Sequence, residues 1–273
     1  MQLIDLGYYK HICERYGVTV DAAIALGTRA NGRRPDLPGS STCAPVVGMT
    51  HEEIWDMRDR STEESVFQFY EDQGAWSTFR QVVRHSALTQ LHLNLLGPLL
   101  RGGSHVCEYG CGVAPFSASL LQNITGSDGM GLMVSLSDVQ SEHFRFGAWR
   151  LESIINDRQL HDVTLSVKPV TVDALPKYDA PIDVAIIFEV LEHVPSPIAT
   201  ALNMLEQMVP GGYIIENFIK HERHENDASG SDLDSAANER DAFYATIDER
   251  MELALGGPPV EHPNMTRVWR MRQ

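Results

Sequence analysis

The chain has 273 residues and a formal net charge of −15, because 37 Asp and Glu outnumber 22 Lys and Arg. A hydrophobic content of 43% and a charged content of 22% are those of an ordinary globular protein, which excludes wholesale disorder. Binding to nucleic acid or to an anionic membrane needs clustered cations, so the acidic balance disfavours both partners. We expect neutral or cationic small molecules, or a second copy of the chain, as partners.

The cysteine usage and the hydropathy pattern predict a cytoplasmic protein. Four cysteines in the whole chain are too few and too scattered for a disulfide framework, so we expect reduced thiols. The first ten residues lack the basic and apolar regions of a secretory signal. The most apolar stretch, residues 184–190, is far shorter than the ~20 residues that a membrane helix needs.

Residues 1–100 are expected to form a helical N-terminal cap or lid with an interruption. Residues 29–48 are rich in Gly, Pro and Ser, a composition that cannot hold a helix. Capping-box spacings that start at Thr50 and Ser61 predict two helices beyond this linker. A longer helix is expected over residues 78–96.

From about residue 104, short apolar runs alternate with helical stretches, which is typical of a parallel sheet with helices on both faces. The runs are nearly continuous in hydrophobic residues, as doubly buried strands are. We therefore predict an α/β fold whose doubly wound, mostly parallel sheet has about seven strands. The expected strands are residues 105–109, 132–136, 163–170, 184–188, 213–218 and 266–271, and the expected helices are residues 116–124, 146–155, 198–208 and 240–255.

The most informative segment is His-Val-Cys-Glu-Tyr-Gly-Cys-Gly, at residues 105–112. A strand delivers Glu108, and Gly110 and Gly112 then turn the chain into a helix that opens at Pro115. Glycines suit such a turn because a Cβ would block the approach of a ligand to the backbone. The N–H groups at the helix start can meet a carboxylate or a phosphate. Alone, the two glycines are equally compatible with an ordinary tight turn.

Acidic and polar side chains follow the next predicted strands, at the edge where open α/β sheets collect ligands. In a Rossmann site a carboxylate at the end of the second strand binds ribose hydroxyls, typically ~20 residues after the glycines. Asp128 has nearly that spacing but stands before the strand, whereas Asp138 ends it, so we choose Asp138. Asp173 follows the third strand, and Glu189 and His193 follow the fourth.

With Glu108 two positions before Gly110, the segment resembles the (Glu/Asp)-x-Gly-x-Gly signature of class I S-adenosylmethionine (SAM)-dependent methyltransferases. Residues 188–194 and 209–216 are similar to the family's segments after strand four and at the turn into strand five. The resemblance runs from about residue 104 to 218. It implies a Rossmann-like fold for residues 101–273, SAM as the cofactor, and transfer of a methyl group to a small-molecule nucleophile.

The resemblance also implies site residues. Asp138 would take the ribose hydroxyls of SAM, and Asp173 with Ala174 would lie along the adenine. Glu189 and Val190 would lie near the sulfonium, and the glycine-rich turn would line the amino-acid end of the cofactor. The cofactor-binding residues expected in that turn are Glu108, Tyr109, Gly110, Cys111 and Gly112.

Two departures from the family pattern concern the turn and the end of the sheet. Ala114 stands at the family's frequent third glycine and is small enough that we expect no loss of binding. Only one strand, residues 266–271, is expected after residue 218, so the family's closing hairpin is expected to be shortened. Residues 219–240 are expected to form a polar loop or lid.

Two further candidates have more than one interpretation. His193 is either a base or substrate contact, or a residue with a structural hydrogen bond. The aromatic stretch 67–79 is either helical core, or a lid in which Tyr70 and Arg80 reach the carboxylate of SAM. Candidate catalytic residues are thus His193 and Tyr70. The histidines within residues 221–224 lack the His-Glu-x-x-His arrangement of a metal site, so no metal is expected.

The predicted activity needs little dedicated catalytic machinery, because the sulfonium of SAM is already activated. Alignment of donor and acceptor supplies much of the rate, and a base is needed only for a protonated nucleophile. Three alternatives stay open: a SAM-consuming enzyme that cyclises SAM and releases methylthioadenosine, a nicotinamide-dependent oxidoreductase, and a non-catalytic SAM-binding module. The oxidoreductase would need a glycine at position 115, which is Pro.

Overall fold

The computed structural model describes most of the chain. Among its described residues, no helix is long and apolar enough to cross a membrane. The predicted linker at 29–48, the alternative Asp128 and the histidines within 221–224 lie outside them. The described residues are 6–28, 51–58, 62–72, 74–85, 94–124, 130–219 and 233–273.

The chain divides into two compact units, each assembled from three segments that are separate in the sequence. The predicted domains, 1–100 and 101–273, stay predictions, because these units follow contacts rather than continuous stretches. The first unit consists of Met1–Pro98, Gly112–Gly129 and Val139–His161. The second unit consists of Leu99–Cys111, Met130–Asp138 and Asp162–Gln273.

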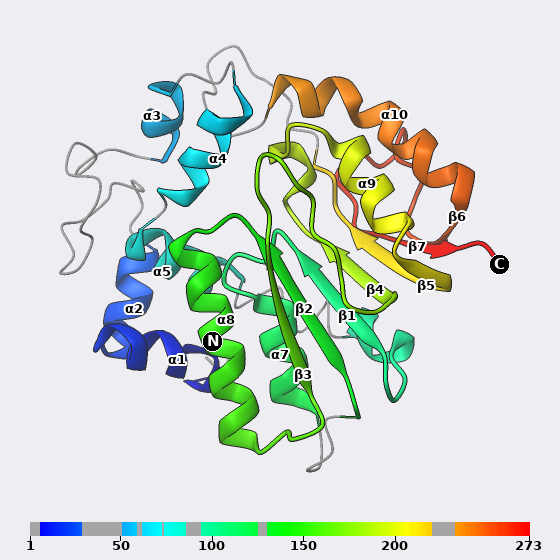
Figure 1. Ribbon diagram of the computed structural model, residues 1–273. Coiled ribbons are helices and arrows are strands. Elements are labelled where there is room, and N and C mark those ends of the chain that lie inside the picture. Colours follow the sequence, from blue (N-terminus) through cyan, green and yellow to red (C-terminus); the bar gives the residue numbers. More distant parts are fainter. Residues whose placement is uncertain are drawn as a thin grey trace. The chain divides into compact units, whose positions relative to one another are not determined.

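Among the residues that the structure describes in the second unit, seven strands form one sheet. They are β1 (His105–Tyr109), β2 (Met133–Asp138), β3 (Thr164–Pro169), β4 (Ile182–Ile187), β5 (Met208–Glu216), β6 (Met251–Leu255) and β7 (Arg267–Met271). Their order is β3-β2-β1-β4-β5-β7-β6 (Figure 1). Strands β1 to β5 are parallel, and β7 is antiparallel to both of its neighbours. The direction of the order reverses between β1 and β4, which is the doubly wound arrangement of Rossmann-like sheets, so the predicted fold class is confirmed.

The strand predictions succeed where strands are buried on both faces. The five residues of β1 are all buried, and the predicted range 105–109 coincides with its bounds. Val184, Ala185 and Ile187 in β4 are likewise at most 1% exposed. A continuous apolar run is therefore a reliable sign of the central strands in this chain.

The predicted start of β5 is wrong. The helix expected over 198–208 is α9 (Pro197–Leu205), and β5 begins at Met208. The Pro-Gly-Gly segment that resembled a turn lies inside β5, where the pairing with β4 shifts register between Ile182 and Val184. Gly211 within this segment has a φ of +77°, which lets the strand carry this irregularity.

The end of the sheet also differs from the prediction. Residues 240–255 are not one helix, because α10 (Asp234–Arg250) ends before β6 begins. α10 also starts inside the stretch 219–240 that was expected to be a loop, and residues 220–232 lie outside the described part. The sequence Met-Glu-Leu-Ala-Leu of β6 consists of good helix formers, but pairing with β7 overrides that preference. The closing hairpin is therefore present and not shortened.

The first unit is helical. Its helices are α1 (Leu6–Tyr16), α2 (Val20–Gly27), α3 (His51–Asp56), α4 (Glu63–Glu71), α5 (Ala75–His85), α7 (Pro115–Asn123) and α8 (Glu142–Arg158). α1, α2, α5 and α8 share a core with the residues just before α7. The buried members of that core are Tyr9, Ile12, Ala23, Phe79, Val82, Val113 and Phe146.

Two helix starts in the first unit differ from the prediction. The N-cap of α4 is Thr62 rather than Ser61, and its hydroxyl accepts a hydrogen bond from the Ser65 N–H at 3.2 Å. The N-cap is the residue whose hydroxyl accepts a hydrogen bond from an N–H of the first helical turn. Adjacent Ser and Thr residues both carry such a hydroxyl, so the sequence does not distinguish them. The helix expected over 78–96 begins at Ala75, and residues 86–93 of it lie outside the described residues.

Candidate cofactor-binding site

The carboxyl ends of four strands of the second unit lie next to one another. Tyr109 of β1 pairs with Ser137 of β2 on one side and with Ile187 of β4 on the other, and Ile187 pairs with Glu216 of β5. The residues that follow these strands are therefore gathered at one edge of the sheet, where ligands of open α/β sheets bind.

The turn after β1 requires glycine at position 110. Gly110 has a φ of +63°, and its N–H donates to the Ser137 carbonyl at 2.7 Å. The Cys111 N–H donates to the same oxygen at 3.1 Å. A Cβ on Gly110 would lie 2.2 Å from Cγ2 of Val190, so the Val190 side chain occupies the space that a side chain at 110 would need. Glycine at 110 thus leaves room for the Val190 side chain, and the approach of a ligand to this turn stays a prediction.

Gly112 is the first residue of its segment in the first unit and has a φ of +48°. A Cβ there would lie 2.3 Å from Oε1 of Gln81, a residue of α5. Nε2 of Gln81 lies 3.1 Å from Nδ1 of His143. Sequence reasoning selected Arg80 on this helix for the carboxylate of SAM, which stays a prediction, and did not select the next residue, Gln81, which packs beside Gly112. Only the packing of α5 could reveal this, because neighbouring residues of a helix point in different directions.

Ala114 caps α7 in the left-handed region, with a φ of +50° and a ψ of +55°. This conformation suits glycine better than alanine, which explains why a glycine is frequent at this place in the family. Pro115 follows as the first residue of α7, where its fixed φ fits the start of a helix.

The other residues expected in the turn are buried. Glu108 and Tyr109 are 2% and 3% exposed. Burial raises the pKa of the Tyr109 hydroxyl and that of the Cys111 thiol well above their ordinary values, and it raises the pKa of the Cys107 thiol to about 12. These cysteines are therefore thiols at neutral pH and are poor nucleophiles.

Two acidic residues chosen from the sequence stand at the end of β2 and in the turn after β3. Asp138 is the last residue of β2, as predicted from the sequence, and it is half-buried. Its carbonyl accepts a hydrogen bond from the Val170 N–H at 2.9 Å. Asp173 and Ala174 are exposed in a tight turn closed by a bridge between Thr171 and Ala174.

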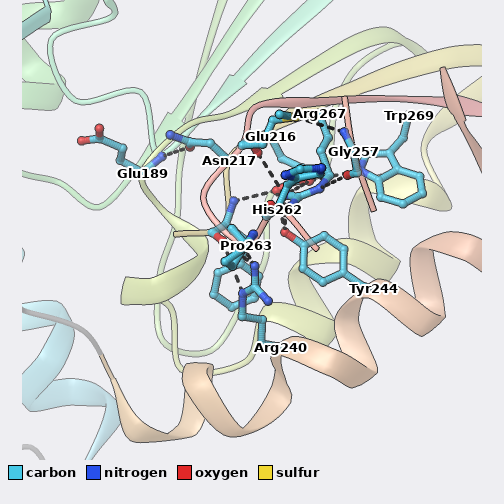
Figure 2. A network of polar contacts seen from close by, with 12 residues as sticks. Glu189, Glu216, Asn217, Arg240, Tyr244, Gly257, His262, Pro263, Arg267 and Trp269 are labelled. Atoms are coloured by element: carbon cyan, nitrogen blue, oxygen red, sulfur yellow. Dashed lines mark hydrogen bonds and ion pairs between the residues drawn. The ribbon is translucent and has the colours of Figure 1, made fainter. Parts of the chain in front are cut away.

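The segment after β4 has an unusual backbone. Glu189 has a φ of +53°, and its N–H donates to Oδ1 of Asn217 at 2.6 Å. Figure 2 shows its carboxylate pointing away from the surrounding network. His193 ends the short helix η3 (Leu191–His193), and its Nε2 lies 3.9 Å from Oε1 of the buried Glu192. This distance is longer than a hydrogen bond, so the structural hydrogen bond of His193 and its role as a base both stay predictions.

Tyr70 belongs to the first unit. Its ring lies 5.1 Å from that of Phe69 and 6.2 Å from that of Trp55. These contacts fit the helical-core interpretation of the aromatic stretch, and contact of Tyr70 or Arg80 with SAM stays a prediction.

Sequence reasoning missed a buried polar network at the end of β5 (Figure 2). Glu216 is fully buried and accepts hydrogen bonds from the Phe218 N–H at 2.6 Å and the Trp269 indole N–H at 3.1 Å. The Tyr244 hydroxyl donates to it at 3.2 Å, and the buried Arg267 guanidinium lies 3.5 Å away. Burial raises the pKa of the Glu216 carboxyl, and these donors and Arg267 act against that rise. The signal in the sequence was an acidic residue at the end of an apolar strand.

A cavity of about 290 Å³ lies at the opposite ends of β4 and β5. Its lining includes Tyr178, Asp179 and Gln207, which precede these strands. It is therefore separate from the carboxyl edge, and no residue predicted for the cofactor lines it.

Residues 80–242 match the model of the methyltransferase domain family. The chain belongs to the class I SAM-dependent methyltransferases. SAM is accordingly its cofactor. A search of curated proteins found no match.

Several solved structures are similar to this methyltransferase at low identity. A SAM-dependent methyltransferase from Aquifex aeolicus is 16% identical, with a TM-score of 0.46, over 70% of this chain and 97% of that chain. The N-methyltransferase NodS from Bradyrhizobium japonicum, in complex with S-adenosyl-L-homocysteine (SAH), is 15% identical, with a TM-score of 0.43, over 77% and 98%. The [4+2]-cyclase SpnF is 18% identical, with a TM-score of 0.45, over 65% of this chain and 61% of that chain. Similarities this low say nothing of the substrate.

Proposed function

We propose that this methyltransferase transfers the methyl group of SAM to a small-molecule nucleophile. The observation that supports this most is the carboxyl edge of the sheet, where the turn at Gly110 and Gly112 follows β1 and Asp138 offers a carboxylate at the end of β2. A glycine turn and a strand-end carboxylate are the features with which Rossmann-type sites meet a cofactor and its ribose diol. Bound SAM supplies an electrophilic methyl group. The protein therefore has to bind and orient the methyl donor and the acceptor, and to exclude water.

The proposed roles follow the order of the strands. Asp138 accepts hydrogen bonds from the ribose hydroxyls, and Asp173 with Ala174 lies along the adenine. Glu189 and Val190 face the sulfonium end. His193 acts as a base where the acceptor arrives protonated.

The acceptor is proposed to be a neutral or cationic small molecule. The net charge of −15 disfavours association with polyanions, which argues against nucleic acid as a substrate. A second copy of the chain is the proposed protein partner.

Identification of the sulfur product tests the reaction. The purified protein is incubated with SAM alone and then with sets of amines, phenols and thiols, and the products are separated by mass spectrometry. We expect SAH to form only when an acceptor is present. Methylthioadenosine from SAM alone would instead show cyclisation, and an absence of turnover despite SAM binding would indicate a binding module.

Replacement of Asp138 by Ala tests the proposed ribose contact. We expect the binding free energy of SAM to weaken by about 1.5–3 kcal/mol, because a charged hydrogen-bonding group is lost. Titration calorimetry would show this as a roughly 10- to 150-fold rise in Kd. The control is Asp179→Ala, which removes an exposed carboxylate that pairs with Lys168. Equal affinities for wild type and Asp138→Ala would refute the contact.

A further inference from the structure

We propose that Asn217 is a positioning residue for the cofactor-binding turn, whose amide oxygen holds Glu189 in the left-handed conformation that seats Val190 against Gly110. The inference rests on the proposed function, because it assigns a role to a residue behind the proposed SAM site. None of the sequence motifs includes Asn217.

The backbone of Glu189 has a left-handed conformation. A φ of +53° is uncommon for a residue other than glycine and persists only where the surroundings fix it. The hydrogen bond from the Glu189 N–H to Asn217 Oδ1, at 2.6 Å, is such a constraint. It connects the residues that follow two adjacent strands, β4 and β5.

Asn217 is itself held in place by its neighbours in the chain. Asn217 is 8% exposed and stands between two anchored residues. Glu216 before it is held by the buried network, and the Phe218 carbonyl after it accepts a hydrogen bond from Arg240 at 3.2 Å. Arg240 also lies over the ring of Tyr244, 4.9 Å from its centroid. α10 and the closing hairpin thus give Asn217 a rigid support (Figure 2).

Glu189 is connected to the turn at the carboxyl edge of the sheet through Val190. Val190 follows Glu189 and fills the space beside Gly110, since its Cγ2 lies 2.2 Å from the position that a Cβ on Gly110 would take. The Gly110 N–H in turn binds the carbonyl of Ser137, the residue before Asp138. Release of Glu189 would therefore loosen the contact that packs the turn next to Asp138.

The experiment compares Asn217→Ala, which removes the acceptor, with Asn217→Asp, which keeps an oxygen in the same place. Two quantities are measured: hydrogen exchange of the Glu189 amide, and the Kd of SAM by titration calorimetry. In Asn217→Ala we expect exchange about 10-fold faster and a Kd about 10-fold higher, the size of one lost hydrogen bond to a buried amide. In Asn217→Asp we expect both within about 3-fold of wild type, because the acceptor is retained.

A matched control separates positioning from general loss of stability. Asn203 donates through its side chain to the Pro176 carbonyl at 3.2 Å, away from the carboxyl edge. Asn203→Ala is expected to leave the affinity for SAM unchanged. Should Asn217→Ala fail to fold, Asn217→Ser takes its place, because a hydroxyl is too short to reach the Glu189 N–H.

The possible results are distinguishable. If wild type binds SAM and Asn217→Ala binds it equally well, this inference fails and the proposed function stands. If Asn217→Asp is as weak as Asn217→Ala, retention of the acceptor does not matter and the inference also fails. If wild type does not bind SAM, the proposed function fails, and the inference falls with it.

Discussion

Replacement of Glu216 by Ala is expected to lower the free energy of unfolding by about 3–5 kcal/mol, because it leaves a buried cation without its carboxylate. Glu216 and Arg267 have side chains that are 0% exposed, so water cannot take over the lost interaction. The Trp269 indole N–H and the Tyr244 hydroxyl would also lose their acceptor. Urea unfolding followed by circular dichroism measures the loss.

The control for Glu216→Ala is Glu252→Ala. Glu252 lies on β6 with an exposed side chain, 3.7 Å from Arg270. Exposed ion pairs are worth about 0–1 kcal/mol, so this variant should be nearly as stable as wild type. Similar losses in the two variants would mean that the buried network does not hold the end of the sheet together.

Gly110→Ala is expected to have the second-largest effect, on stability and on SAM binding together. The new Cβ would meet Val190 at 2.2 Å while the residue is held at a φ of +63°. Overpacking and the left-handed conformation together should cost about 2–4 kcal/mol of stability. A folded fraction should bind SAM at least about 10-fold more weakly, since a displacement of the turn moves the backbone that faces the ligand.

Gly103→Ala is the matched control for this variant. Gly103 has a φ of +80°, and a Cβ there would have no neighbouring atom within 4 Å, so alanine brings conformational strain without a clash. We expect a loss of about 1 kcal/mol of stability and no change in the affinity for SAM. A SAM affinity for Gly110→Ala equal to that of Gly103→Ala would contradict the close approach.

The sequence predicted the parts of the fold that have a local signature. Buried central strands appear as continuous apolar runs, and the position of Asp138 follows from the end of such a run. β6 has no such signature, because it is an edge strand made of helix-forming residues, three of which are exposed. Its identity as a strand depends on pairing with β7 across the intervening residues 256–266, which no pattern within β6 reveals.

The missed site residues share a similar cause. Asn217 acts on Glu189, 28 positions earlier, and the contact exists only because β4 and β5 are neighbours. Gln81 reaches Gly112 only through the packing of α5. Patterns within a short window predict glycines and strand-end carboxylates, whereas contacts between elements need the three-dimensional structure.

Hydrogen exchange of the wild-type protein with and without SAM tests the location of the cofactor most directly. We predict that SAM slows exchange in the peptides that contain Gly110, Asp138 and Glu189, and leaves the peptide that contains Tyr178, beside the cavity at the opposite strand ends, unchanged. Protection at Tyr178 with none at Gly110 or Asp138 would contradict a site at the carboxyl edge of the sheet.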